Sequence, residues 1–223
     1  MTQSRNAILD RLRKAQPPTA QRADQGCPTV SKAELSADTR LALWIHHLES
    51  AHAQVVLANT ACWPEHLLAT LPQPAPAHWL LSPEHPYASR WADALHGMNP
   101  LPEIRYYDQS INALKSSIFN SVDASLTSAR FGIAETGTLV LEPTAQEPRL
   151  MSLVPPLHVA IVKASSVLST FQDYLQLNAW AASTIPTNIV LISGPSKTAD
   201  IQQTLAYGAH GPKALIVVVL TDA

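Results

Sequence analysis

Residues 214–220 read Ala214-Leu-Ile-Val-Val-Val-Leu220, an unbroken apolar run that is typical of a strand covered on both faces of a parallel sheet. The run Ile189-Val-Leu-Ile192 has the same character. From residue 120 onward, apolar segments alternate with turn-forming residues. We predict strands over 122–128, 138–142, 157–163, 188–193 and 214–220. We predict helices over 166–182 and 199–207. This alternation predicts an α/β domain with helices on both faces of the sheet.

The first half of the chain is richer in proline and contains shorter apolar runs. The order Ser31-Lys-Ala-Glu34 has the form of a capping box and predicts a helix whose apolar face is Leu41, Trp44, Ile45 and Leu48. Short apolar runs then predict strands near residues 54–58, 79–81 and 104–107. Before them, residues 2–15 predict an amphipathic helix, and three prolines mark a linker over 16–30. We therefore divide the chain into an N-terminal helix and linker, 1–30, and an α/β domain, 31–223.

Composition narrows the classes of function. The chain has 223 residues, 14% of them charged, and a formal net charge of -2, which does not favour a nucleic-acid partner. Its two cysteines, Cys27 and Cys62, are fewer than the four ligands that an iron–sulfur cluster takes. We find no metal-binding motif, no apolar run of the ~18 residues that a membrane span needs, and no signal peptide. These features predict a cytoplasmic protein without a metal site.

A first candidate site lies in the segment Phe131-Gly-Ile-Ala-Glu-Thr-Gly-Thr-Leu-Val-Leu141, where Glu135 stands between apolar residues and a glycine turn. A carboxylate in apolar surroundings has its charged form destabilised, which is how catalytic acids and nucleophiles are often prepared. The alternative is structural, because Glu135 could accept hydrogen bonds from the turn or pair with Arg130. Thr136, Gly137 and Thr138 complete this candidate.

A second candidate site is the segment Asn188 to Ile201, which reads as a strand, a loop of small residues and a helix. The start of a helix presents free N–H groups and favours anions, and Ser196, Lys197 and Thr198 add donors and a positive charge. The spacing is neither that of a phosphate-binding loop nor that of a dinucleotide fingerprint. Ordinary helix capping by Asp200 and Gln203 is the alternative interpretation.

Two histidines stand in informative positions. His210 lies between Gly208 and Gly211 at the entrance to the last strand, where it could bind a ligand or simply occupy an exposed turn. His158 opens strand 157–163 after two prolines, and we interpret it as a hydrogen-bonded structural histidine.

Four ordered motifs together resemble the LUD-domain family, specifically its lactate utilization protein C type. The matching motifs are Ala134–Thr138, Leu153–His158, Gly194–Ile201 and Gly208–Pro212. The resemblance implies a NagB/RpiA/CoA-transferase-like fold and a role as one subunit of a system that oxidises L-lactate to pyruvate. It also implies that the iron–sulfur clusters belong to partner subunits and that this chain carries no cofactor of its own.

The resemblance leaves two further roles open. Related CoA transferases and sugar-phosphate isomerases use a carboxylate that carries an acyl group or transfers a proton, a role that Glu135 could take. The chain could instead be a structural adaptor for partner subunits. For the role in lactate oxidation we expect residues 134–138, 194–200 and 208–212 to converge on one pocket for a small carboxylate or phosphate. The expected ligand-binding residues are Thr136, Gly137, Thr138, Gly194, Ser196, Lys197, Thr198, Asp200, His210 and Gly211, with Glu135 as the catalytic residue.

Overall fold

The computed structural model describes one large part of the chain and a few N-terminal positions. The described residues are 35–109, 111–178, 186–199, 205–207 and 211–223, together with Ala7, Asp10, Arg11 and Lys14. The chain divides into a unit of residues 1–34 and a unit of residues 35–223. In the first unit the four described residues are helical and exposed. The rest of the predicted helix 2–15 and the whole linker 16–30 lie outside the described residues.

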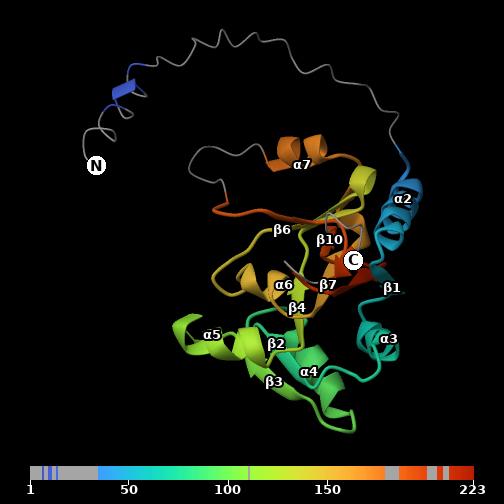
Figure 1. The fold of residues 1–223 in the computed structure, drawn as a ribbon. Helices are drawn as coiled ribbons and strands as arrows, with labels where there is room; N and C mark the ends of the chain where they lie inside the picture. The colour runs from blue at the N-terminus through green and yellow to red at the C-terminus, as the bar shows by residue number, and fades with distance from the viewer. Residues whose placement is uncertain are drawn as a thin grey trace. The chain divides into compact units, whose positions relative to one another are not determined.

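A six-stranded parallel sheet forms the centre of the second unit (Figure 1). Its order is β1-β12-β7-β4-β2-β3, and every neighbouring pair runs parallel. The strands are β1 (Gln54–Ala58), β2 (His78–Leu81), β3 (Glu103–Tyr106), β4 (Ala124–Ser128), β7 (Leu157–Lys163) and β12 (Ala214–Leu220). The α/β prediction is confirmed, and so is the central position of the apolar run 214–220.

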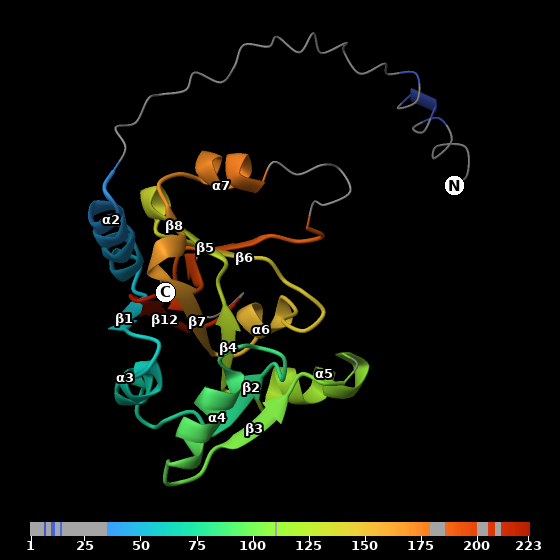
Figure 2. The ribbon, with the colours of Figure 1, turned by 180° about the vertical axis from the view of Figure 1, so that it is seen from behind.

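Helices cover both faces of this sheet, as predicted. On one face, Trp63 of α3 (Trp63–Thr70) and Trp91 of α4 (Ala88–His96) are buried with Trp79 of β2. Their core includes alternate residues of β7 and β12. The other face packs against α2 (Ala37–Ser50), α5 (Ile111–Asn120) and α6 (Leu150–Leu153). Figure 2 shows α2 and α3 on opposite sides of β1 and β12. The residues of each central strand therefore divide between two cores, which explains their continuous apolar character.

Helix α2 begins later than its sequence pattern predicts. Ser36 is its N-cap, and the Ser36 hydroxyl accepts a hydrogen bond of 3.2 Å from the backbone N–H of Thr39. Residues 31–34, where we expected the capping box, lie outside the described residues. The predicted apolar face is confirmed, because Trp44 and Leu48 are fully buried.

A second, four-stranded sheet lies on the α2 face, in the order β8-β5-β6-β9. Its strands are β5 (Phe131–Ile133), β6 (Thr138–Leu141), β8 (Val167–Leu168) and β9 (Val190–Ile192). Short 3₁₀ helices, η1 (Ala134–Thr136) and η2 (Ala164–Ser166), connect them to their neighbours. The expectation that residues 189–192 form a doubly covered parallel strand is wrong, since β9 pairs antiparallel with β6 at an edge and Leu191 is 50% exposed.

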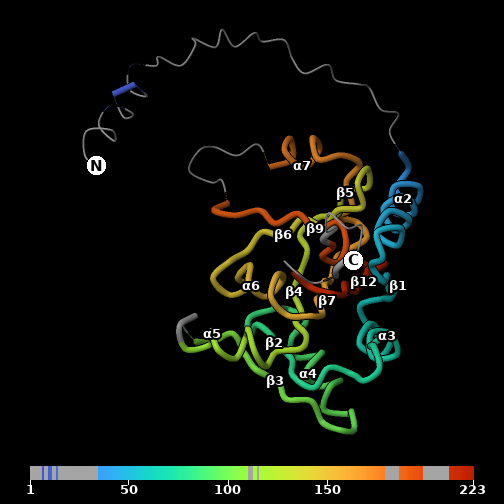
Figure 3. Tube along the Cα trace, in the orientation of Figure 1, coloured from blue at the N-terminus to red at the C-terminus, as the bar shows by residue number. Residues whose placement is uncertain are grey.

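Two predicted helices also need correction. The helix expected over 166–182 is α7 (Phe171–Asn178), preceded by η2 and β8, and residues 179–182 lie outside the described part. The helix expected over 199–207 is wrong. Lys197–Ala199 forms β10 and Leu205–Tyr207 forms β11, and the two strands pair antiparallel. Pairing satisfies their backbone groups and overrides the local helix signal. Figure 3 follows the chain through α7 and β9 to β12.

Candidate functional site

Two of the three predicted segments meet at a cavity of about 190 Å³ above the amino-terminal ends of β7 and β12. We call it the His158 cavity. Its lining residues are Ser152, Leu153, His158, Leu191, Ile192, Ser193, Gly194, Pro195, Ser196, Gly211, Pro212 and Leu215. The backbone N–H of Ser196 donates a hydrogen bond of 2.9 Å to the carbonyl oxygen of Pro212, which holds the two loops together. Gly194, Ser196 and Gly211 are thus brought together as predicted.

Among the described residues of this lining, His158 is the titratable side chain, and it is completely buried. Its Nε2 atom lies 2.8 Å from the hydroxyl oxygen of Thr127, on the neighbouring strand β4. Its Nδ1 atom has no hydrogen-bond partner within the described part of the chain. Burial lowers the pKa of His158 to about 4, although the charge of Glu147 acts in the opposite direction. The imidazole is therefore neutral near pH 7, and Nδ1 is free to donate or accept one hydrogen bond.

The tautomer of His158 depends on Thr127. When the Thr127 hydroxyl donates to Nε2, the proton of the neutral ring resides on Nδ1, and Nδ1 becomes a hydrogen-bond donor. This arrangement confirms that His158 is hydrogen-bonded, as the sequence indicated. Its place on the cavity wall was not predicted, because the Leu153–His158 motif contains no signal for it.

The segment 134–138 does not place Glu135 where the sequence suggested. Glu135 lies on η1 and is exposed, so the expected desolvated carboxylate is wrong. Its backbone N–H donates to the carbonyl oxygen of Ser169, and Glu135 is not one of the residues that line the His158 cavity. The apolar neighbours in the sequence turn into the core, which leaves the carboxylate itself facing outward. A catalytic role for Glu135 stays a prediction.

Hydroxyl groups connect this segment with the cavity wall. The Thr136 and Thr138 hydroxyl oxygens are 2.6 Å apart, and the Thr138 hydroxyl is 2.7 Å from the hydroxyl of Ser193. Ser193 lines the His158 cavity. Thr136 and Thr138 therefore lie beside the cavity and support its wall through Ser193.

The glycines of both segments pack against the carboxyl-terminal end of α2. Gly137 has a φ of 61°, and a Cβ atom there would lie 2.5 Å from the Cβ of His47. Gly194 has a φ of 147°, and its Cβ would lie 3.0 Å from Ala51. Both positions require glycine for backbone conformation and for close approach to the helix. Backbone conformation and packing against α2 are therefore sufficient to explain both glycines.

The remaining predicted anion-binding residues lack the geometry on which that prediction depended. Lys197 is exposed on β10, and the helix whose amino-terminal end was to attract the anion is a strand. The side chain of Thr198, and residues Asp200 and His210 altogether, lie outside the described part. The helix start expected at Lys197 is therefore wrong, and the ligand-binding roles of Lys197, Thr198, Asp200 and His210 stay predictions.

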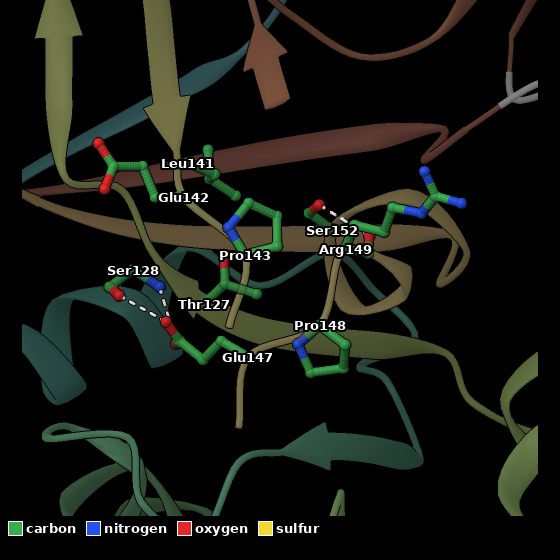
Figure 4. Close-up of a pocket in the computed structure, with 9 residues that line it drawn as sticks. All are labelled: Thr127, Ser128, Leu141, Glu142, Pro143, Glu147, Pro148, Arg149 and Ser152. Carbon is green, nitrogen blue, oxygen red and sulfur yellow. Dashed lines mark hydrogen bonds between the residues drawn. The ribbon is translucent and has the colours of Figure 1, made fainter. Parts of the chain in front are cut away.

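A second cavity adjoins the first (Figure 4). It is lined by Thr127, Ser128, Leu141, Glu142, Pro143, Glu147, Pro148, Arg149 and Ser152. Thr127 and Ser152 connect the two cavities, since Ser152 lines both and Thr127 contacts His158. Figure 4 shows Glu147 turned toward Ser128, whose backbone N–H and hydroxyl donate to the carboxylate at 3.1 and 2.7 Å.

A buried histidine completes the surroundings of Glu147. The Nδ1 atom of His85 accepts a hydrogen bond of 3.1 Å from the backbone N–H of Tyr87, so in the neutral ring the proton is on Nε2. Nε2 lies 3.0 Å from a carboxylate oxygen of Glu147. The sequence did not identify His85, Thr127 or Glu147, because they lie on different elements and follow no common spacing.

The described residues hold no group of three or more His, Cys, Asp or Glu side chains that could bind a metal ion. Cys62 is a partly buried free thiol that precedes α3, and Cys27 lies outside the described residues. No helix in the described ranges is both long enough and apolar enough to cross a membrane.

The parallel sheet, the second small sheet and the polar cavity between them define an α/β protein with a candidate small-molecule site. The sequence profile of the LUD domain matches residues 41–220, and the chain belongs to the LUD domain family. The resemblance stated from the four motifs is therefore confirmed.

Two curated proteins are similar to part of this chain. The chain is 41% identical over 140 residues to the uncharacterized protein NMB1437 of Neisseria meningitidis serogroup B. The matched region covers 63% of this chain and 58% of that protein. It is 36% identical over 119 residues to lactate utilization protein C of Macrococcus caseolyticus, and this match covers 52% of each chain. The chain spans about half the length of the curated relatives it matches.

A solved structure shares the fold. It is a DUF162 family protein from Deinococcus radiodurans, with a TM-score of 0.62 and 18% sequence identity over 84% of this chain and 100% of that one. At this identity the likeness shows the fold alone.

Proposed function

We propose that this chain is a non-redox subunit of a multi-subunit system that oxidises L-lactate to pyruvate in the cytoplasm. The observation that carries the proposal is the similarity to proteins named lactate utilization protein C. In this proposal the partner subunits hold the iron–sulfur clusters. The two cysteines of this chain support that division, because a cluster takes four ligands.

Within this system the chain binds a small anionic ligand, a carboxylate or a phosphate, in the His158 cavity. Support comes from the convergence of Gly194, Ser196 and Gly211 on one recess that also contains a buried imidazole and three serine residues. Small-molecule sites commonly combine an apolar lining with a few polar groups that orient the ligand.

Gene deletion in the native host tests the proposed function. We expect the deletion strain to lose growth on L-lactate and to regain it when the wild-type gene is supplied, while growth on glucose stays normal. A tagged copy should co-purify with iron–sulfur partner proteins. Normal growth on lactate, or lactate oxidation by the purified chain alone with an artificial electron acceptor, would contradict the proposal.

The same strain separates the two alternative roles. Complementation with Glu135→Gln keeps the size of the side chain and removes its charge. Loss of growth with normal partner association would favour a CoA-transferase-like or isomerase-like enzyme that uses this carboxylate. Full growth would leave ligand binding or a structural adaptor role, which direct binding measurements distinguish.

A further inference from the structure

We infer that His158 is a ligand-binding residue of the His158 cavity, and that the cavity takes a small monocarboxylate whose carboxylate accepts a hydrogen bond from Nδ1. The ligand class rests on the proposed function, which supplies L-lactate and pyruvate as probes. The role of His158 itself rests on the structure alone.

The first argument is the unpaired nitrogen. His158 has no exposed surface, and its Nδ1 is without a partner in the described part of the chain while Nε2 contacts Thr127. Buried polar atoms in folded proteins nearly always have a hydrogen-bond partner, and each exception needs an explanation. Because His158 also lines the cavity, a ligand bound there would supply the missing partner.

The second argument is the chemistry of the lining. Leu153, Leu191 and Leu215 present apolar groups, and Ser193 and Ser196 present hydroxyls beside the imidazole. Among the described residues of the lining, none is Lys, Arg, Asp or Glu. Burying a doubly charged phosphate without a counter-charge is costly, whereas one carboxylate can be satisfied by a few neutral donors. A small molecule with a short carbon chain and one carboxylate matches this lining, because the chain can contact the leucines and the carboxylate can contact the serines and the imidazole.

The third argument is the fixed orientation of the ring. Strands β4 and β7 are paired with Ser125 opposite His158, so the backbone places Thr127, two residues farther along β4, diagonally from the ring. A Thr127 hydroxyl that donates to Nε2 leaves the ring proton on Nδ1, where a carboxylate needs a donor. Thr127 is in this account a positioning residue, and it sets the tautomer without touching the ligand.

Two amide substitutions test the role of each ring nitrogen in the full-length chain. The amide of His158→Asn reaches the place of Nδ1, whereas the longer amide of His158→Gln reaches the place of Nε2 and Thr127. Calorimetry with L-lactate and with pyruvate should give binding to the wild type and to His158→Asn within about threefold. His158→Gln should bind at least about tenfold more weakly, a loss of about 1.4 kcal/mol. Circular dichroism and thermal melting establish that both variants fold.

A measurement on the wild-type chain needs no variant. Nitrogen-15 spectra of the histidines should show a change at Nδ1 of His158 when lactate or pyruvate is added, with the exposed His66 unchanged. Equal binding by the two variants, or no binding of either monocarboxylate by the wild type, would overturn the inference. Tighter binding of inorganic phosphate or of an acyl-CoA than of lactate would overturn the ligand class.

The growth test of the proposed function gives a separate answer. A deletion strain that fails on lactate, together with a wild-type chain that binds neither probe, would remove this inference and keep the proposed function. Binding that depends on His158, together with normal growth of the deletion strain on lactate, would keep this inference about His158 and remove the proposed function.

Discussion

Acidification is expected to destabilise this protein through His158. Burial lowers the pKa of His158 in the folded chain to about 4, from an ordinary value of 6.5. In the unfolded chain the imidazole is in water and regains its ordinary pKa. Between these two values the unfolded state therefore binds a proton that the folded state does not, and the free energy of unfolding falls as the pH falls.

The size of the effect follows from the two pKa values. Each pKa unit corresponds to about 1.4 kcal/mol, so a decrease of about 2.5 units corresponds to about 3 kcal/mol. The contribution is complete above pH 6.5 and is lost progressively down to about pH 4. This amount is a large fraction of the roughly 5–15 kcal/mol that stabilises a typical domain.

Urea unfolding followed by tryptophan fluorescence measures this quantity at a series of pH values. Three of the five tryptophans, Trp63, Trp79 and Trp91, are buried in one core, which makes the signal sensitive to unfolding. The His158→Asn variant is the control, because asparagine does not titrate. All other ionisable groups are common to both proteins, so the difference between the two pH profiles isolates His158.

The expected result is a wild-type profile that falls by about 3 kcal/mol more than the variant profile between pH 6.5 and about pH 4. Two parallel profiles would refute the reasoning. They would mean that the imidazole keeps its ordinary pKa in the folded chain, and that the ring is hydrated or charged rather than buried and neutral.

Three further predictions concern individual contacts. Gly137→Ala should cost about 2–3 kcal/mol in urea unfolding, because of its positive φ and its closeness to α2, whereas Gly97→Ala should change stability by less than about 1 kcal/mol. Thr170→Ala removes the hydroxyl that caps α7 at 3.2 Å and should cost about 1 kcal/mol, seen as faster hydrogen exchange within α7; unchanged exchange would argue against the cap. Glu147→Gln removes a charge that raises the pKa of His158, so that pKa should fall further in an NMR titration, and an unchanged or higher value would contradict the assigned interaction.

The central strands could be predicted from sequence because the signal for them is local. Continuous apolar runs at 157–163 and 214–220 indicate burial on both faces, and both runs form central strands. The run 189–192 looks the same but pairs at an edge of the second sheet. An apolar run shows that a segment packs somewhere, and it contains no information about which sheet supplies the neighbours.

Helix ends and short strands were harder to predict for a related reason. The capping pair Thr170 and Asp173, whose backbone and side-chain groups bond reciprocally, is readable in the sequence and marks the true start of α7. The Asp200 and Gln203 pair gave a similar signal in a region where β10 and β11 instead pair with each other. Local capping signals decide the outcome only when no tertiary partner competes for the backbone.

The candidate site was predicted where glycines revealed it and missed where it depends on pairing between strands. Gly194, Ser196 and Gly211 reach the cavity from two loops, and turn-forming residues in sequence indicate such loops. Thr127 and His158 are 31 positions apart and meet because β4 and β7 are neighbours. No spacing rule predicts that contact without the strand order.

The strand order also decides which end of the sheet carries each cavity. Open α/β sheets usually bind ligands at the carboxyl ends of their strands, and the second cavity follows this rule with Ser128 at the end of β4. The His158 cavity lies instead at the amino-terminal ends of β7 and β12, where β9 and the loop after it cover the sheet. Because the Thr127 hydroxyl contacts His158 while Thr127 lines the second cavity, a ligand at one end is only one side chain away from the carboxylate of Glu147 at the other. Thr127 therefore connects the surroundings of the two cavities within the fold, while the catalytic role of Glu135 stays a prediction.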